Sequence, residues 1–274
     1  MLTVKFNGTS IPQIGLGTWP MQDDVCQQAV ETALEVGYRH VDTAQMYGNE
    51  AAVGAGLAAG NVARSELFVT TKIWPDHHAR DNLLRAADER LALLKVDYVD
   101  LLLLHWPSRD VPLSETIPAL NETLSAGKAR AIGISNFTAR QIDEAVALSR
   151  APLTLNQVEY HPYLNQQPVI EACGRHGLGM TAYCPTARGR VLDDPVIMNI
   201  ASSHGKTPAQ TALRWLIQQS VVVIPKSETP ARIRENFEIS DFELSDMEMQ
   251  AITALHEPGG RIVDMENIRP EWDS

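Results

Sequence analysis

The chain has 274 residues, 44% of them hydrophobic, and a formal net charge of −11. The hydrophobic content is too high for a disordered chain, and the length suits one (β/α)8 barrel of about 250 residues better than two small domains. The acidic balance argues against general binding to nucleic acid or anionic membranes, although a cofactor phosphate needs only a local basic cluster.

Two further features bear on the compartment of the protein. No apolar run approaches the roughly 20 residues of a membrane helix, and residues 1–8 lack the basic and apolar segments of a signal peptide. The three cysteines, Cys26, Cys173 and Cys184, are odd in number and widely spaced. We therefore expect a cytoplasmic protein with neither a membrane nor a nucleic-acid partner.

Short β-rich runs alternate with longer helical patterns along the whole chain. The first two runs, 3–6 and 11–13, flank an Asn7-Gly8 turn and predict a hairpin at the bottom of a barrel. The eight strands expected after it are 14–17, 40–43, 67–72, 99–105, 131–136, 153–159, 179–185 and 221–226.

Helical spacing of apolar residues is clearest over 23–36 and 80–95. The expected N-caps are Asp24, Ser114 and Thr207, and the glycines expected to end helices are Gly37, Gly60 and Gly177. Eight strands, each followed by a helix and with no linker between them, predict one (β/α)8 TIM barrel over residues 1–274. An open doubly wound sheet is the alternative, but residues 15–20 do not match the dinucleotide fingerprint expected at its first turn.

Residues 54–59 (GAGLAA) match a loose form of that fingerprint. The fingerprint requires a strand directly before the glycines and a helix that begins at them. Here the glycines fall inside an alanine-rich helical segment, so they are better explained by close packing between helices.

Four reactive side chains follow three successive predicted strands. Asp42 ends the second strand and is followed by Tyr47, Lys72 ends the third, and His105 ends the fourth. Each residue alone has an ordinary structural explanation, as a turn cap, a rim charge or a core histidine. Because functional groups of a barrel gather at the C-terminal ends of its strands, their joint placement predicts an active site.

The four side chains together suit the reduction of a carbonyl group. Reduction needs a hydride at carbon and a proton at oxygen, which the Tyr47 hydroxyl would supply. A tyrosine has a pKa of about 10, and we expect the neighbouring Lys72 ammonium to lower it. Asp42 would keep Lys72 charged, and His105 would orient the carbonyl oxygen.

Three longer motifs resemble the signatures of the aldo-keto reductase family. They are residues 37–44 (GYRHVDTA) with Tyr47 and Glu50, residues 130–137 (RAIGISNF), and residues 224–227 (IPKS) with Arg232 and Asn236. Together they span most of the chain in the expected order. The overall length and the ending, 261–273, are most similar to bacterial 2,5-diketo-gluconate reductases.

The resemblance implies a catalytic tetrad of Asp42, Tyr47, Lys72 and His105, and NADPH as the cofactor. For the nicotinamide end it implies contacts from Ser135, Asn136 and Gln157, with Tyr183 stacked on the ring, and it places Thr18 among the cofactor-binding residues. Around the phosphates and adenine it implies Thr186, Arg188, Lys226, Ser227, Arg232, Glu235 and Asn236. This chain has Cys-Pro-Thr after Tyr183, where many relatives have Ser-Pro-Leu.

Three tryptophans, Trp19, Trp74 and Trp106, follow predicted strands and suggest an apolar wall for the substrate. Trp272, near the C-terminus, is expected in a covering loop. The resemblance implies a small carbonyl substrate and a monomer.

Two other functional readings compete with an NADPH-dependent reductase. One is a regulatory or structural protein that binds the cofactor on the same barrel, because fold alone does not fix function. The other is a metal-dependent hydrolase, suggested by His77-His78, but no further ligand follows at metal-binding spacing, so we expect no metal.

Overall fold

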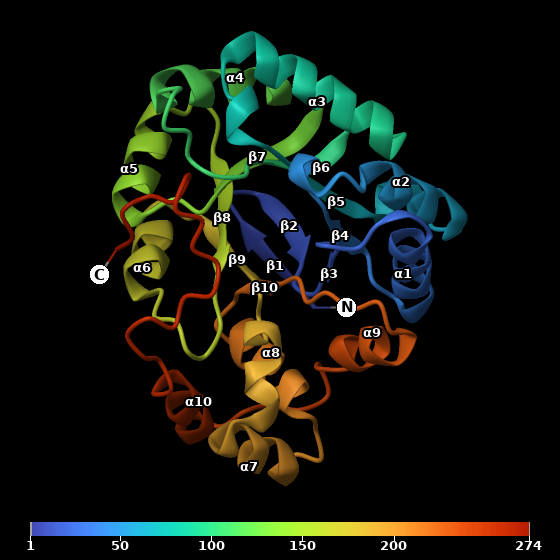
Figure 1. Cartoon of the computed structure of the whole chain (residues 1–274), viewed down its shortest axis with the longest axis vertical. Helices are drawn as coiled ribbons and strands as arrows, with labels where there is room; N and C mark the ends of the chain where they lie inside the picture. The colour runs from blue at the N-terminus through green and yellow to red at the C-terminus, as the bar shows by residue number, and fades with distance from the viewer. Residues whose placement is uncertain (1, 274) are drawn as a thin grey trace.

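The structure is a computed structural model that describes residues 2–273. Eight parallel strands form one sheet in the order β10-β9-β8-β7-β6-β5-β4-β3, ringed by helices (Figure 1). The sheet closes where Ile14 pairs in parallel with Val223, and Gly15 N donates to the Val223 carbonyl at 2.9 Å. The predicted (β/α)8 barrel is confirmed.

The barrel strands are β3 (Leu16–Gly17), β4 (His40–Asp42), β5 (Phe68–Ile73), β6 (Val99–Leu104), β7 (Ala129–Ser135), β8 (Leu153–Glu159), β9 (Gly179–Tyr183) and β10 (Val222–Val223). The helices that connect and follow them are α1 (Asp23–Val36), α2 (Glu50–Ala59), α3 (Arg80–Leu94), α4 (Leu113–Ser125), α5 (Ala139–Leu148), α6 (Gln167–Arg175), α7 (Pro195–Ser203), α8 (Pro208–Gln218), α9 (Pro230–Phe237) and α10 (Asp246–Thr253). Every barrel strand is fully buried except for Arg130 in β7 and the half-buried last residue of β9, as expected of parallel strands covered by helices. No helix between residues 2 and 273 is both long and apolar enough to cross a membrane.

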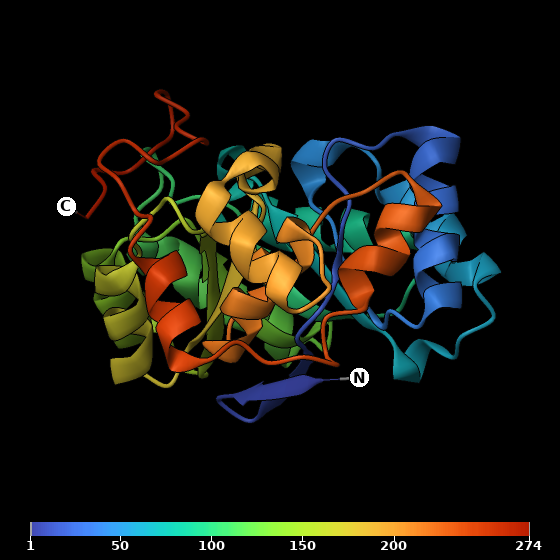
Figure 2. The same ribbon diagram turned by 90° about the horizontal axis from the view of Figure 1, so that it is seen from below.

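The N-terminal hairpin consists of β1 (Thr3–Phe6) and β2 (Thr9–Pro12). Phe6 pairs with Thr9, and Asn7 and Gly8 have φ values of 42° and 88°, so the turn has the two positive φ angles of a tight hairpin. A Cβ on Gly179, the first residue of β9, would lie 2.1 Å from the Phe6 ring. The hairpin therefore covers the N-terminal ends of the strands, below the barrel in Figure 2.

The predicted helix ends are partly right. Thr207 caps α8, with its side chain bonded to Gln210 N, and Gly37 ends α1 in the left-handed conformation at φ 119°. Asp24 and Ser114 were wrong as N-caps, because α1 begins after Gln22 and α4 after Pro112. Asp24 instead lies in the first turn, where a negative charge interacts favourably with the helix dipole.

The glycines of α2 serve helix packing. A Cβ on Gly54 would lie 2.5 Å from the Leu94 carbonyl oxygen, and one on Gly56 would lie 2.7 Å from Val30 Cβ. Both positions lie within α2, so α1 and α3 approach it closely only because side chains are absent there. Rejection of the dinucleotide fingerprint at 54–59 is thereby confirmed.

Candidate active site

The four reactive side chains predicted from the sequence meet at one end of the barrel. Asp42 ends β4, Lys72 lies near the end of the neighbouring β5, and His105 directly follows β6. Tyr47 is the last residue of a short 3-10 turn, η1 (Gln45–Tyr47), between β4 and α2. Parallel strands bring their C-terminal ends to the same rim, which explains the convergence.

Lys72 is the centre of this cluster. Its side chain is fully buried, and its ammonium donates to Asp42 Oδ1 at 2.5 Å, to the Thr43 carbonyl at 2.8 Å and to the Tyr47 hydroxyl at 3.3 Å. An ammonium has three protons, and three oxygens surround it. The three acceptors fix the direction of the ammonium and offset part of the cost of burying its charge.

The segment that carries Tyr47 is held by Asn49. The Asn49 side chain accepts from Thr43 Oγ1 at 2.7 Å and donates to the carbonyls of Thr18 and Met21 at 3.1 and 2.9 Å. Thr18, expected at the cofactor, is itself fully buried and donates through Oγ1 to the Asp42 carbonyl at 3.0 Å. These bonds join the loop after β3 to the loop after β4.

The pKa values in the cluster differ in part from the expectation. Burial, and then the negative charge of Asp42, raise the pKa of Tyr47 well above its usual range. The pKa of Tyr47 is thus not lowered overall, because loss of solvation outweighs the stabilisation that the Lys72 ammonium gives the phenolate at 3.3 Å. Tyr47 is thus a neutral phenol at neutral pH, which is the form that donates a proton.

His105 is neutral for a related reason. Burial, followed by the positive charge of Lys72, lowers the pKa of His105 well below its usual range. Its Nδ1 atom is buried and has no partner among residues 2–273. The imidazole can therefore donate or accept one hydrogen bond without carrying a charge.

Aromatic rings frame Tyr47 and His105. Trp19 lies 5.1 Å from the Tyr47 ring, Trp74 lies 5.2 Å from the His105 ring, and the Tyr47 and His105 rings meet edge to face at 5.6 Å. Trp106 differs from the expectation of an open wall, because it is only 2% exposed. Trp272 covers it, with ring centroids 5.9 Å apart.

The side chains expected at the nicotinamide form a connected network. Tyr183 donates to Asn136 Oδ1 at 2.8 Å, and Asn136 donates to the His105 carbonyl at 2.9 Å. Ser135 donates to the Gln157 carbonyl at 2.8 Å, and Gln157 donates to Asp42 Oδ2 at 2.8 Å. Asn136 also donates to Ser135 Oγ at 3.1 Å, so the network joins the C-terminal ends of β7, β8 and β9 to the Asp42–Lys72 ion pair.

The cationic side chains expected at the phosphates follow two neighbouring strands. Arg188 lies in η4 (Ala187–Asp193) after β9, and Lys226 and Ser227 follow β10. Lys226 pairs with Glu228, whereas Arg188 and Arg232 are exposed and make no ion pair within residues 2–273. Thr186 begins η4 and accepts from Gly189 N through its carbonyl, in a loop where Arg188 and Gly189 have positive φ values of 53° and 96°.

The two residues expected near the adenine lie on α9. The Glu235 carboxylate already accepts from Thr207 Oγ1 at 2.8 Å, so part of its role is to fasten α9 to α8. Asn236 is 8% exposed. The exposed guanidinium groups of Arg188 and Arg232 suit phosphates, and the amide side chains with the Tyr183 ring suit a nicotinamide, so the residues present fit a phosphorylated nicotinamide dinucleotide.

Sequence reasoning missed how the C-terminal segment is fastened over the mouth. The buried Glu159 carboxylate, at the end of β8, accepts from Ile262 N at 2.6 Å and Val263 N at 2.8 Å. Arg190 pairs with Glu257 at 2.7 Å. A Cβ on Gly260 would lie 1.9 Å from the Tyr163 carbonyl oxygen, so the segment passes there in close contact. An acidic residue at a strand end, like Asp42, was the available signal.

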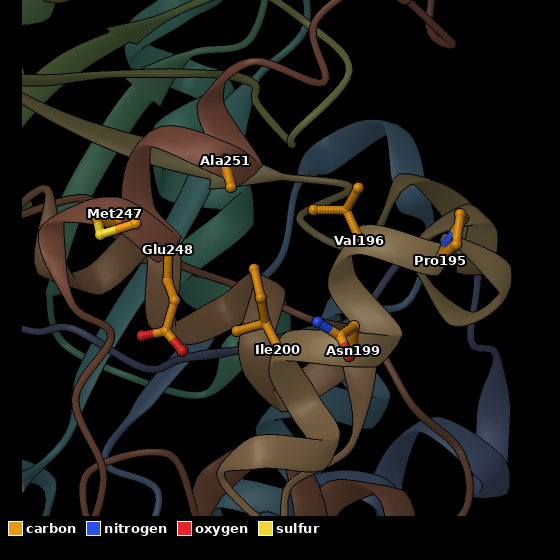
Figure 3. Close-up of a pocket in the computed structure, with 7 residues that line it drawn as sticks. All are labelled: Pro195, Val196, Asn199, Ile200, Met247, Glu248 and Ala251. Carbon is orange, nitrogen blue, oxygen red and sulfur yellow. The ribbon is translucent and has the colours of Figure 1, made fainter.

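A groove between α7 and α10 lies apart from this cluster (Figure 3). Val196 and Ile200 of α7 face Met247 and Ala251 of α10, and none of the groove residues is among the predicted site residues.

His78 is buried, with Nε2 3.1 Å from the Ile73 carbonyl. Within residues 2–273 no three histidine, cysteine or acidic side chains are grouped so as to hold a metal ion.

A tyrosine beside a buried lysine–aspartate pair at the mouth of a barrel suits proton transfer to a carbonyl oxygen, as in an oxidoreductase. The chain belongs to the aldo/keto reductase family, a family of NADP-dependent oxidoreductases, whose profile matches residues 13–257. The family predicted from the three motifs is confirmed.

Named relatives align with this chain over nearly its full length. The methylglyoxal reductase DkgB of Escherichia coli O157:H7 is 42% identical over 267 residues, which cover 96% of this chain and 100% of that protein. A crystal structure provisionally assigned as a 2,5-diketo-D-gluconic acid reductase B is 48% identical, with a TM-score of 0.96 and coverage of 99% and 98%. An aldo-keto reductase from Bombyx mori in complex with NADP is 36% identical, with a TM-score of 0.90 and coverage of 97% and 96%.

Proposed function

We propose that this protein reduces small aldehydes and ketones to alcohols with NADPH, and that Tyr47 is the proton donor. The observation that carries the proposal is the contact of the Lys72 ammonium with the Tyr47 hydroxyl at 3.3 Å, beside His105 and under an aromatic frame. Reduction of a carbonyl builds negative charge on its oxygen, and the neutral Tyr47 phenol stands ready to protonate it.

The roles of the other residues follow from their charges and contacts. When bound, NADPH supplies the hydride that reaches the carbonyl carbon. His105, held neutral, donates a hydrogen bond that directs the carbonyl oxygen toward Tyr47. As the phenol gives up its proton, the Lys72 ammonium stabilises the phenolate that forms, and Asp42 keeps that ammonium in place.

The preference for the phosphorylated cofactor rests on the loop after β10 and the start of α9. Lys226, Ser227 and Arg232 offer charge-assisted hydrogen bonds to a phosphate on the adenosine ribose. The nicotinamide end would meet Ser135, Asn136 and Gln157, with Tyr183 against the ring. NADH lacks that phosphate, so this cluster contributes to the binding of NADPH alone.

The substrate class follows from the mouth and from the relatives. Names among the relatives include methylglyoxal and 2,5-diketo-D-gluconic acid reductases, which points to small, polar carbonyl compounds. Between β6 and α4 only residues 105–112 intervene, so few side chains from this loop select among substrates. Trp19 and Trp74 supply the apolar side of the site.

A Tyr47→Phe variant tests the assignment. Removing the phenolic proton should lower kcat by about 10²–10⁴-fold, because general acid catalysis contributes that much, while the fold and NADPH binding stay intact. A cofactor-binding regulatory protein would bind NADPH but would not oxidise it with methylglyoxal or another small aldehyde. Absence of NADPH consumption across a panel of carbonyls would favour that alternative, and a fully active variant would remove Tyr47 as the donor.

A further inference from the structure

Glu50 is a buried carboxylate that the proposed chemistry does not use. It is the first residue of α2, is 1% exposed, and accepts from Thr71 Oγ1 at 2.5 Å. An Arg90 nitrogen of α3 lies 2.9 Å from its second oxygen. Burying a carboxylate is costly even when it is paired, so a neutral residue would pack these helices more cheaply.

The position of Glu50 along the chain links it to the reacting groups. Tyr47 precedes Glu50 by three residues, and Thr71 directly precedes Lys72. The bond between Glu50 and Thr71 therefore ties the turn that carries the phenol to the strand that carries the ammonium. Successive side chains of a strand point to opposite faces, so Glu50 meets β5 from the helix side while Lys72 faces the mouth.

The charged groups that face Glu50 come from β5 and α3. Burial raises the pKa of Glu50 to about 7, against the Thr71 hydrogen bond and the charges of Arg90 and Lys72, which lower it. Burial also lowers the pKa of Lys72, which Asp42 and Glu50 oppose. α1, on the other side of α2, approaches it through neutral groups, at Val30 and the Gln27 carbonyl.

We propose that Glu50 is a positioning residue: it fastens the Tyr47 turn to β5, and its negative charge helps to keep the Lys72 ammonium protonated. Glu50 acts on the chemistry only through Lys72, so its role rests on the proposed function of Tyr47. Neutral Glu50 leaves Asp42 as the remaining anion that supports Lys72. The reductase then loses its ammonium at a lower pH.

The pH dependence of kcat in Glu50→Gln tests this role. Glutamine keeps an oxygen for Thr71 but carries no charge, so wild type and variant should have kcat values within about twofold of each other below pH 6, where Glu50 itself is neutral. Above pH 7 the alkaline fall in kcat should begin about one pH unit earlier in the variant, with KM and the Kd for NADPH unchanged. Asp88→Asn, which neutralises an exposed carboxylate of α3 paired with Lys128, is the matched control and should keep the wild-type profile.

A loss of kcat by the same factor at every pH would show a purely structural role and overturn the proposal, as would an unchanged profile. Thr71→Val removes the bond that lowers the pKa of Glu50, so it should move the alkaline limb in the same direction, and it decides the matter if Glu50→Gln does not fold. Full activity in Tyr47→Phe would instead overturn the proposed function itself. If Tyr47→Phe loses most of its kcat while Glu50→Gln keeps the wild-type pH profile, only the role of Glu50 is overturned.

Discussion

The attachment of the C-terminal segment depends on one buried carboxylate, and replacing it should release the segment. Glu159 accepts from the main chain at Ile262 and Val263 and from His161 Nε2 at 2.9 Å. Glutamine offers one acceptor oxygen for these three donors and turns an amide group toward the rest. Hydrogen bonds to charged groups contribute about 1.5–3 kcal/mol each, so Glu159→Gln should favour opening by about 2–3 kcal/mol, or roughly 30- to 150-fold.

The rate of trypsin cleavage after Arg261 measures this opening directly. The peptide bond after Arg261 is the one whose nitrogen, Ile262 N, is held by Glu159, so cleavage there requires the segment to lift. When opening and closing are fast, the cleavage rate follows the open population and should rise by the same factor. Glu257→Gln breaks the exposed pair with Arg190 and should change the rate only a few-fold. Equal cleavage rates in Glu159→Gln and wild type would refute the reasoning.

The hydrogen bonds of Glu159 also make the attachment of the C-terminal segment depend on pH. Although burial alone would raise the pKa of Glu159, its hydrogen bonds hold it below the usual value. A depressed carboxylate pKa stabilises the docked segment fully above the unfolded pKa of about 4.3 and loses that effect as pH falls through the folded value. Protection of the bond after Arg261 should therefore be constant from pH 8 to 5 and fall only in stronger acid, measured with an acid-stable protease or by hydrogen exchange.

Three further outcomes test other parts of the structure. Lys72→Met should lower kcat at least about 100-fold and abolish the alkaline inflection, and a pH–rate profile that keeps it would disconnect Lys72 from Tyr47. Arg232→Ala should weaken NADPH about tenfold in a fluorescence titration and leave NADH unchanged; equal effects on both would place the phosphate elsewhere. Gly54→Ala should destabilise the protein by about 1–3 kcal/mol in urea, because its Cβ would meet the Leu94 carbonyl, whereas Gly174→Ala, in open space within α6, should be neutral or stabilising.

The barrel was predictable because its signals are local. The barrel strands are short β-rich runs between helical patterns, and the Asn7-Gly8 turn has the two residues that adopt positive φ most easily. The order of strand ends then placed Asp42, Lys72 and His105 on one rim without any knowledge of distances. Helix starts were less predictable, because Ser114 has the chemistry of a cap but the chain enters α4 at Pro112.

The electrostatics and the cover of the site were not predictable, because both depend on residues distant in sequence. The direction of the Tyr47 pKa follows from its burial among loops after several strands and from the nearness of Asp42. Trp106 occupies the position expected of a substrate wall, but Trp272, 166 residues later, covers it. The contact of Gln157 with Asp42 likewise joins two strand ends that the sequence treats as separate sites.

The hairpin at the bottom of the barrel is a suitable point for attaching this enzyme to a surface or a fusion partner. β1 and β2 lie at the end of the barrel opposite the C-terminal segment (Figure 2). Tyr47 follows the C-terminal end of β4, so it also lies at the end away from the hairpin. A bead, surface or fusion partner joined ahead of Thr3 would leave the mouth facing solution. The same attachment made after Asp273 would load the segment that covers Trp106 and change access to the site with every pull on the tether.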